Sequence, residues 1–97
     1  MFQGSVERRL RQATARLRKA RQELAVIDEQ LAALSEEADD LRVRALVGDS
    51  PLADRESRQA QGHVEAMARS RAATVATIAE LERTVDELLE KFVPGAR

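Results

Sequence analysis

The sequence predicts an all-α protein, an antiparallel two-helix coiled-coil hairpin, and three observations support this class. The composition favours long helices, because Ala, Leu, Glu and Arg dominate and only four Gly and two Pro occur among 97 residues. A heptad pattern of apolar residues runs through both halves of the chain. Between the halves, the stretch GDSPLADRE at 48–56 combines turn-forming residues with an acidic cluster.

The first predicted helix spans residues 6–47. Residues 1–5 resemble the remnant of a cleaved expression tag, so the single domain is expected to span 6–93 and to be followed by a tail at 94–97. Apolar residues or Ala recur in alternating steps of four and three, which is the repeat of a coiled-coil seam. The seam positions are Val6, Leu10, Ala13, Leu17, Ala20, Leu24, Ile27, Leu31, Leu34, Ala38, Leu41 and Ala45.

A short turn at 48–50 is predicted to separate this helix from a second helix at 51–93. Gly48 suits the left-handed conformation that ends a helix, Ser50 suits the N-cap, and Pro51 suits the first helical position. The second seam consists of Ala60, Val64, Met67, Arg71, Thr74, Ile78, Leu81, Val85, Leu88 and Phe92. Arg71 and Thr74 fit it poorly, so we expect a local change of phase, with Arg71 pointing outward.

So short a connection makes the helices antiparallel, and the numbers of facing residues should sum to about 99. This register brings Ala13 near Val85 and Ala20 near Ile78. Charge supports it, because residues 1–21 carry seven basic and one acidic side chain (net +6), whereas residues 22–56 carry three and ten (net −7). We therefore expect ion pairs between the helices along their length.

A two-helix hairpin has little core, so we expect it to dimerise into a four-helix bundle or to bind a partner helix. The second helix carries apolar residues beside its seam that could form the contact. This predicted face consists of Ala68, Ala72, Val75, Ala76 and Ala79.

Several classes of chemistry have no support in the sequence. There is no Cys, His63 is the only His, and no Gly-rich phosphate loop or catalytic triad can be assembled. The sequence therefore predicts no enzyme, no cofactor and no metal site. Direct nucleic-acid binding is disfavoured, because the basic residues have acidic residues opposite them and no aromatic residues among them. No apolar run could span a membrane, and a cytoplasmic location is expected.

The acidic corner allows two interpretations. Asp54 and Glu56 suit the first turn of a helix, where they oppose the positive end of its dipole. Alternatively, Asp49, Asp54, Arg55 and Glu56 form a tip that binds a partner, because the second helix has few apolar seam residues near this end.

Residues 48–90, with SPLADRESRQAQ and ATIAELERTVDEL, resemble the hairpin tip and descending helix of DksA/TraR-type regulators, and more distantly of Gre-type factors. The resemblance implies a coiled-coil hairpin that enters the secondary channel of RNA polymerase. Asp54-Arg55 matches the second half of the Asp-x-x-Asp-Arg pattern, while the first acid is replaced by Pro51, and the zinc-binding cysteines of that family are absent. The sequence thus favours a non-enzymatic adaptor or regulator that acts through protein–protein contacts, with a secondary-channel transcription regulator as the alternative.

Overall fold

The computed structural model describes residues 2–48 and 50–92, and these form two helices, α1 (Phe2–Gly48) and α2 (Pro51–Phe92). The predicted all-α helical hairpin is confirmed, and the described residues contain no strand. The chain divides into two compact units. The terminal unit comprises Met1–Leu24 and Thr74–Arg97, and the turn unit comprises Ala25–Ala73. Both helices continue through both units.

The ends of α1 differ from the prediction. The helix begins at Phe2 rather than at residue 6, and it includes the exposed Gly4. Gly48 is the last residue of α1 and does not have the left-handed backbone conformation expected for it. The helical backbone continues through Gly48, so that position does not need the freedom that only Gly provides.

The start of α2 follows the predicted capping pattern. The backbone N–H of Ala53 donates to Ser50 Oγ at 3.4 Å, and the N–H of Asp54 donates to the Ser50 carbonyl at 3.0 Å. Pro51 takes the first helical position, where no N–H is needed. The cap is therefore Ser50, and Asp54 stabilises the helix only as an exposed acid in its first turn.

The terminal unit contains most of the buried side chains. Val6, Ala13 and Leu88 form a core cluster, against which Leu10, Val85 and Phe92 pack. Leu17 and Ala20 are also buried. The presence of Ala13 and Val85 in one cluster agrees with the predicted register. Fully burying one such Leu stabilises the fold by about 1.5–3 kcal/mol.

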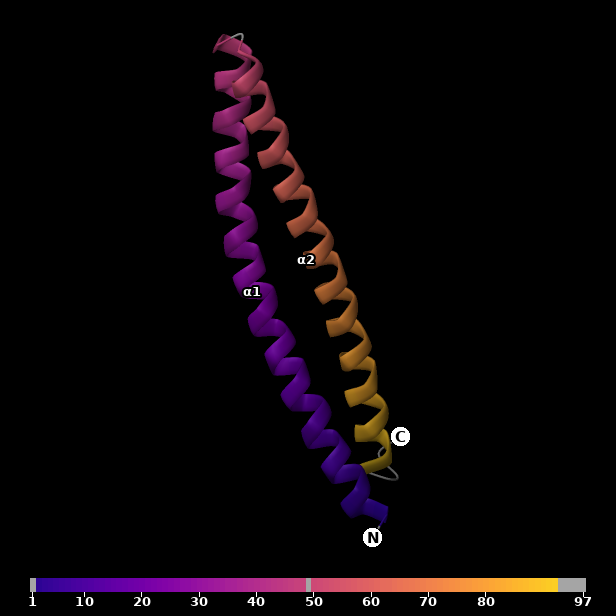
Figure 1. The fold of residues 1–97 in the computed structure, drawn as a ribbon. Coiled ribbons are helices and arrows are strands. Elements are labelled where there is room, and N and C mark those ends of the chain that lie inside the picture. The colour runs from indigo at the N-terminus through magenta and orange to yellow at the C-terminus, as the bar shows by residue number, and fades with distance from the viewer. Residues whose placement is uncertain (1, 49, 93–97) are drawn as a thin grey trace. The chain divides into compact units, whose positions relative to one another are not determined.

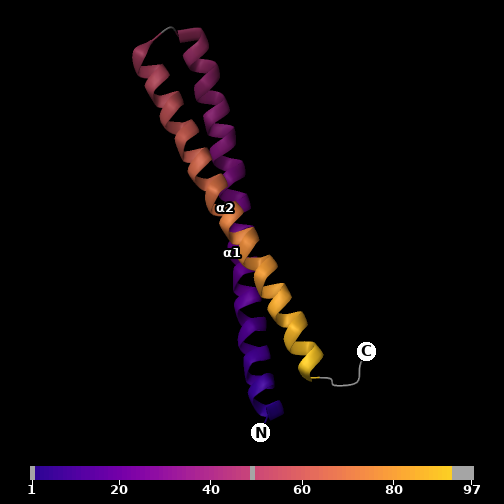
Figure 2. The ribbon, with the colours of Figure 1, turned by 90° about the vertical axis from the view of Figure 1, so that its right-hand side faces the viewer.

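The turn unit is less well buried, and Ala38 is the only buried residue among its described positions. Its segments of α1 and α2 lie side by side in two perpendicular views and meet at the corner (Figure 1, Figure 2). Arg71 Nε donates to Asp28 Oδ1 at 2.6 Å, and the numbers of these two residues fit the predicted register. Both side chains are about half exposed, so Arg71 points outward as expected.

The expected change of phase in the second seam is wrong. Ala68, Ala72 and Val75 are exposed, whereas Met67, Thr74 and Ile78 are half-buried. Met67 and Ile78 bury more apolar surface than Ala could, and Arg71 is accommodated at its seam position by reaching Asp28. The heptad therefore continues through the polar position without a shift.

Gly62→Ala is expected to raise the free energy of unfolding by about 0.5–1 kcal/mol. Gly62 lies inside α2, is exposed, and has open space where a Cβ would be added. Urea denaturation followed by circular dichroism would measure the change. A loss of stability would mean that residue 62 contacts another chain in solution.

Candidate functional site

The corner of the turn unit carries four exposed aliphatic side chains, which we together call the tip patch: Val43, Leu46 and Val47 on α1 and Leu52 on α2. These four side chains are between 52% and 81% exposed. Val43, Leu46 and Val47 share one stripe of α1, because residues three and four apart are neighbours on a helix surface. The seam positions Leu41 and Ala45 take the other side of the helix, so the stripe faces away from α2.

The tip patch was not predicted from the sequence. The sequence does contain a signal for it. Val43, Leu46 and Val47 fall at off-seam positions of the heptad, which soluble hairpins usually fill with polar side chains. The prediction for the corner was based instead on the turn-forming residues at 48–51 and on the acidic residues beside them.

Charged residues surround the tip patch, and most of them are acidic. Asp39 and Asp40 precede Val43 on the same side of α1. Asp39 Oδ1 lies 3.9 Å from Nη2 of Arg42. Across residues 36–56 the chain has seven acidic and three basic side chains, a net charge of −4.

The predicted tip residues Asp54, Arg55 and Glu56 are all exposed. Within the described residues, their side chains have no ion-pair or hydrogen-bond partner. Asp49, the fourth predicted tip residue, lies outside the described residues. The described charges at the corner are thus available to a partner.

The predicted Ala-rich face is divided between the two units. Ala68 and Ala72 belong to the turn unit and are exposed. Val75 and Ala76 are exposed in the terminal unit, where Ala79 is half-buried.

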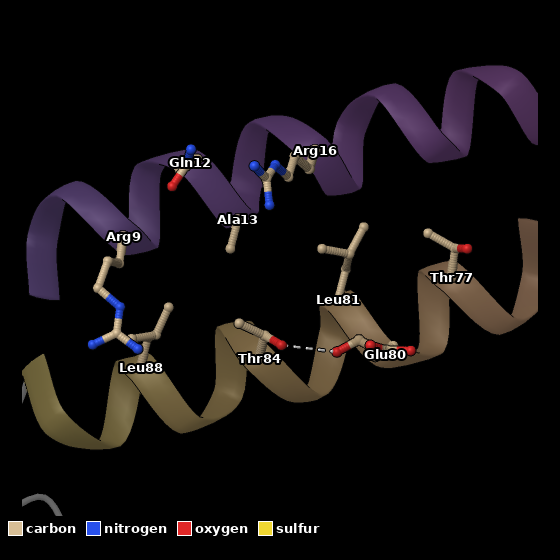
Figure 3. A pocket seen from close by; sticks show the side chains of 9 residues that line it. All are labelled: Arg9, Gln12, Ala13, Arg16, Thr77, Glu80, Leu81, Thr84 and Leu88. Atoms are coloured by element: carbon tan, nitrogen blue, oxygen red, sulfur yellow. Dashed lines mark hydrogen bonds between the residues drawn. The ribbon is translucent and has the colours of Figure 1, made fainter.

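A groove of about 380 Å³ lies between α1 and α2 in the terminal unit (Figure 3). Its floor is apolar, with Leu81 and Leu88 directed towards α1 and Ala13 towards α2. Arg9 and Arg16 extend from α1 on one side, and Glu80 lies on the α2 side. Thr84 Oγ1 donates to the Glu80 carbonyl at 3.1 Å. The remaining lining residues are Gln12 and Thr77.

The predicted series of ion pairs between the helices is mostly absent from the described residues. In the terminal unit, Arg21 reaches Glu82 at 2.9 Å, while Arg11 pairs with Glu7 on its own helix. Exposed pairs contribute at most about 1 kcal/mol and restrict two long side chains, so few of them form. The cations of Arg9 and Arg16 consequently have no ion-pair partner among the described residues.

The described residues contain no group of three or more His, Cys, Asp or Glu side chains placed to hold a metal ion. His63 is exposed. In the same part of the chain, neither helix has a stretch long and apolar enough to cross a bilayer.

No protein-family model, curated protein or solved structure matches the chain. The resemblance of residues 48–90 to secondary-channel regulators stays a prediction.

Proposed function

We propose that this chain is a non-enzymatic helical hairpin that acts as an adaptor or regulator through protein–protein contacts, and that the tip patch is its main contact surface. The observation that carries the proposal is the concentration of exposed aliphatic side chains at the corner. Among the described residues, seven large apolar side chains are exposed, and four of them belong to the tip patch. A cluster of this kind marks a contact site more often than single exposed apolar residues do.

The size of the patch fits a reversible contact. Fully burying one Val or Leu contributes about 1.5–3 kcal/mol, so four partly exposed side chains together supply several kcal/mol. Association costs at least about 4 kcal/mol in lost translational and rotational freedom. The surrounding carboxylates would add orientation and speed of association more than affinity.

The proposal includes self-association into a dimeric four-helix bundle. The Ala-rich face supports it, because small exposed side chains such as Ala68 and Ala72 let a second helix approach closely. It also includes a cytoplasmic location, the reducing compartment that a chain without Cys suits.

The test is affinity capture from the cell that makes the protein, followed by mass spectrometry. The double variant Leu46→Asp/Val47→Asp is expected to lose at least one protein that the original chain retains. Val26→Asp is the matched control, because Val26 is a 51%-exposed Val of the turn unit outside the tip patch. Identical capture by all three chains would refute the tip patch as the contact surface.

A second candidate function is regulation of RNA polymerase through its secondary channel. The side chains of Asp54, Arg55 and Glu56 favour it, because they are exposed and have no ion-pair or hydrogen-bond partner among the described residues. In this case Asp54→Asn/Glu56→Gln should abolish regulation of transcription by purified polymerase while the polymerase is still captured. Unchanged regulation, or none by the original chain, would exclude this candidate.

A further inference from the structure

The tip patch and the groove of the terminal unit have complementary chemistry. The tip patch presents aliphatic side chains beside exposed carboxylates, among them Asp40, Asp54 and Glu56. The groove presents an apolar floor beside the guanidinium groups of Arg9 and Arg16 (Figure 3). Each surface thus combines apolar side chains with charged groups, and the charges that the two surfaces present to each other are opposite in sign.

The charges of the two units extend this complementarity beyond the contact residues. The sequence gives the terminal unit ten basic and seven acidic side chains (net +3) and the turn unit six and ten (net −4). A contact between two tips would bring two negatively charged surfaces together, which is unfavourable. A contact between the tip of one copy and the terminal unit of another joins opposite charges.

The groove also has room for the tip. A volume of about 380 Å³ falls within the range of sites that enclose small ligands, so aliphatic side chains can enter it. Arg9 and Arg16 need not break an ion pair to bind new carboxylates, since they have none among the described residues. Glu80 on the α2 side could bind Arg55 of the incoming tip.

We infer that the partner of the tip patch is a second copy of this chain, whose terminal-unit groove receives Leu46 and Val47 of the α1 stripe. The inference rests on the proposed function, because it uses the same contact surface. The contact is heterologous, since each copy contributes a different surface, and such contacts continue from copy to copy unless a ring closes. It leaves Val75 and Ala79 of the Ala-rich face free. These two residues follow the seam residues Thr74 and Ile78, whereas the groove residues Thr77 and Glu80 precede Ile78 and Leu81.

Sedimentation of mixed variants tests the inference. The original chain should form oligomers at low ionic strength that dissociate as salt rises, because the screening length falls from about 10 Å at 0.1 M to about 3 Å at 1 M. The tip variant Leu46→Asp/Val47→Asp and the groove variant Arg9→Glu/Arg16→Glu should each lose this salt-sensitive association. An equimolar mixture of the two should regain a one-to-one complex, because one intact tip and one intact groove remain.

Two controls match these variants. Arg18→Glu/Lys19→Glu makes the same change in net charge on exposed residues that do not line the groove, and it should associate as the original chain does. Val26→Asp is the control for the tip variant, because it introduces an Asp at an exposed Val of the same unit outside the tip patch. Circular dichroism checks that each variant keeps its helices, which is expected because the four substituted tip and groove positions are exposed.

Disulfide trapping gives a second measurement, because the chain has no Cys of its own. Copies carrying Val47→Cys and copies carrying Gln12→Cys should cross-link when mixed under oxidising conditions, faster than Val26→Cys copies do with Gln12→Cys copies. Equal rates would contradict the proposed contact.

Two results would overturn the inference: a chain that stays monomeric at low ionic strength, or variants whose mixture forms no complex. If either result came with tip-dependent capture of another protein, the proposed function would stand and only the identity of the partner would be wrong. If tip variants changed neither self-association nor capture, the proposed function itself would fail.

Discussion

Leu88→Ala is expected to lower the free energy of unfolding by about 2–4 kcal/mol. Leu88 is 3% exposed and belongs to the core cluster of the terminal unit with Val6 and Ala13. Truncation removes apolar burial and leaves a gap that the facing Ala13 is too small to fill. A small helical domain has only a few kcal/mol of net stability, so much of the terminal unit should lose its helix.

The neighbouring residue provides the control for this change. Leu89 is 43% exposed, so Leu89→Ala makes the same chemical change with less than about 1 kcal/mol of effect. Urea denaturation measures both variants, and hydrogen exchange should place the loss of Leu88 in the terminal unit. Equal effects of the two substitutions would mean that the core does not form in solution as described.

Ala38→Asp should have a comparable effect on the other unit. Ala38 is 4% exposed and is the only buried residue among the described positions of the turn unit. A carboxylate there loses water without gaining a partner, and we expect a loss of about 2–4 kcal/mol. Exchange of the backbone amides between Ala25 and Ala73 should accelerate.

Ala33→Asp is the matched control for Ala38→Asp. Ala33 is exposed on the same helix and in the same unit. Its substitution should cost no more than the difference in helix propensity, about 0.7 kcal/mol. If Ala33→Asp destabilised the chain as much as Ala38→Asp, the face of α1 that carries Ala33 would be covered by another chain and not exposed to solvent.

The heptad pattern predicted burial well, because a 3.5-residue repeat leaves one face of a helix turned towards its neighbour. All twelve predicted seam positions of α1 are buried or half-buried, including small ones such as Ala13 and Ala38. In α2 the single exposed seam residue is Arg71, whose long side chain can leave the seam. Ser50 was predicted as the cap from its position before Pro51, and it is the cap.

Other features depended on geometry that spacing alone does not give. The cross-helix ion pairs were overestimated, because opposite charges on facing helices form pairs only where both side chains reach, as Arg21 and Glu82 do. The tip patch was not predicted although Val43, Leu46 and Val47 fall at off-seam positions, because the exposure of such residues depends on what covers the outer face of the corner. The groove could not be predicted from the sequence, because the places of Arg9 and Arg16 along the chain do not show whether a cavity lies between the helices.

The uneven burial of the two units has a consequence for the order of folding. Contacts in the turn unit join segments that are close along the chain, so closing them costs little entropy. Val6 and Leu88 lie near opposite ends of the chain, and their contact must close almost all of it. The hairpin should therefore form from the corner outward, and the best-buried core should form last. Contacts that form after the transition state slow unfolding without speeding folding. The core cluster of the terminal unit should therefore determine how slowly the folded hairpin unfolds.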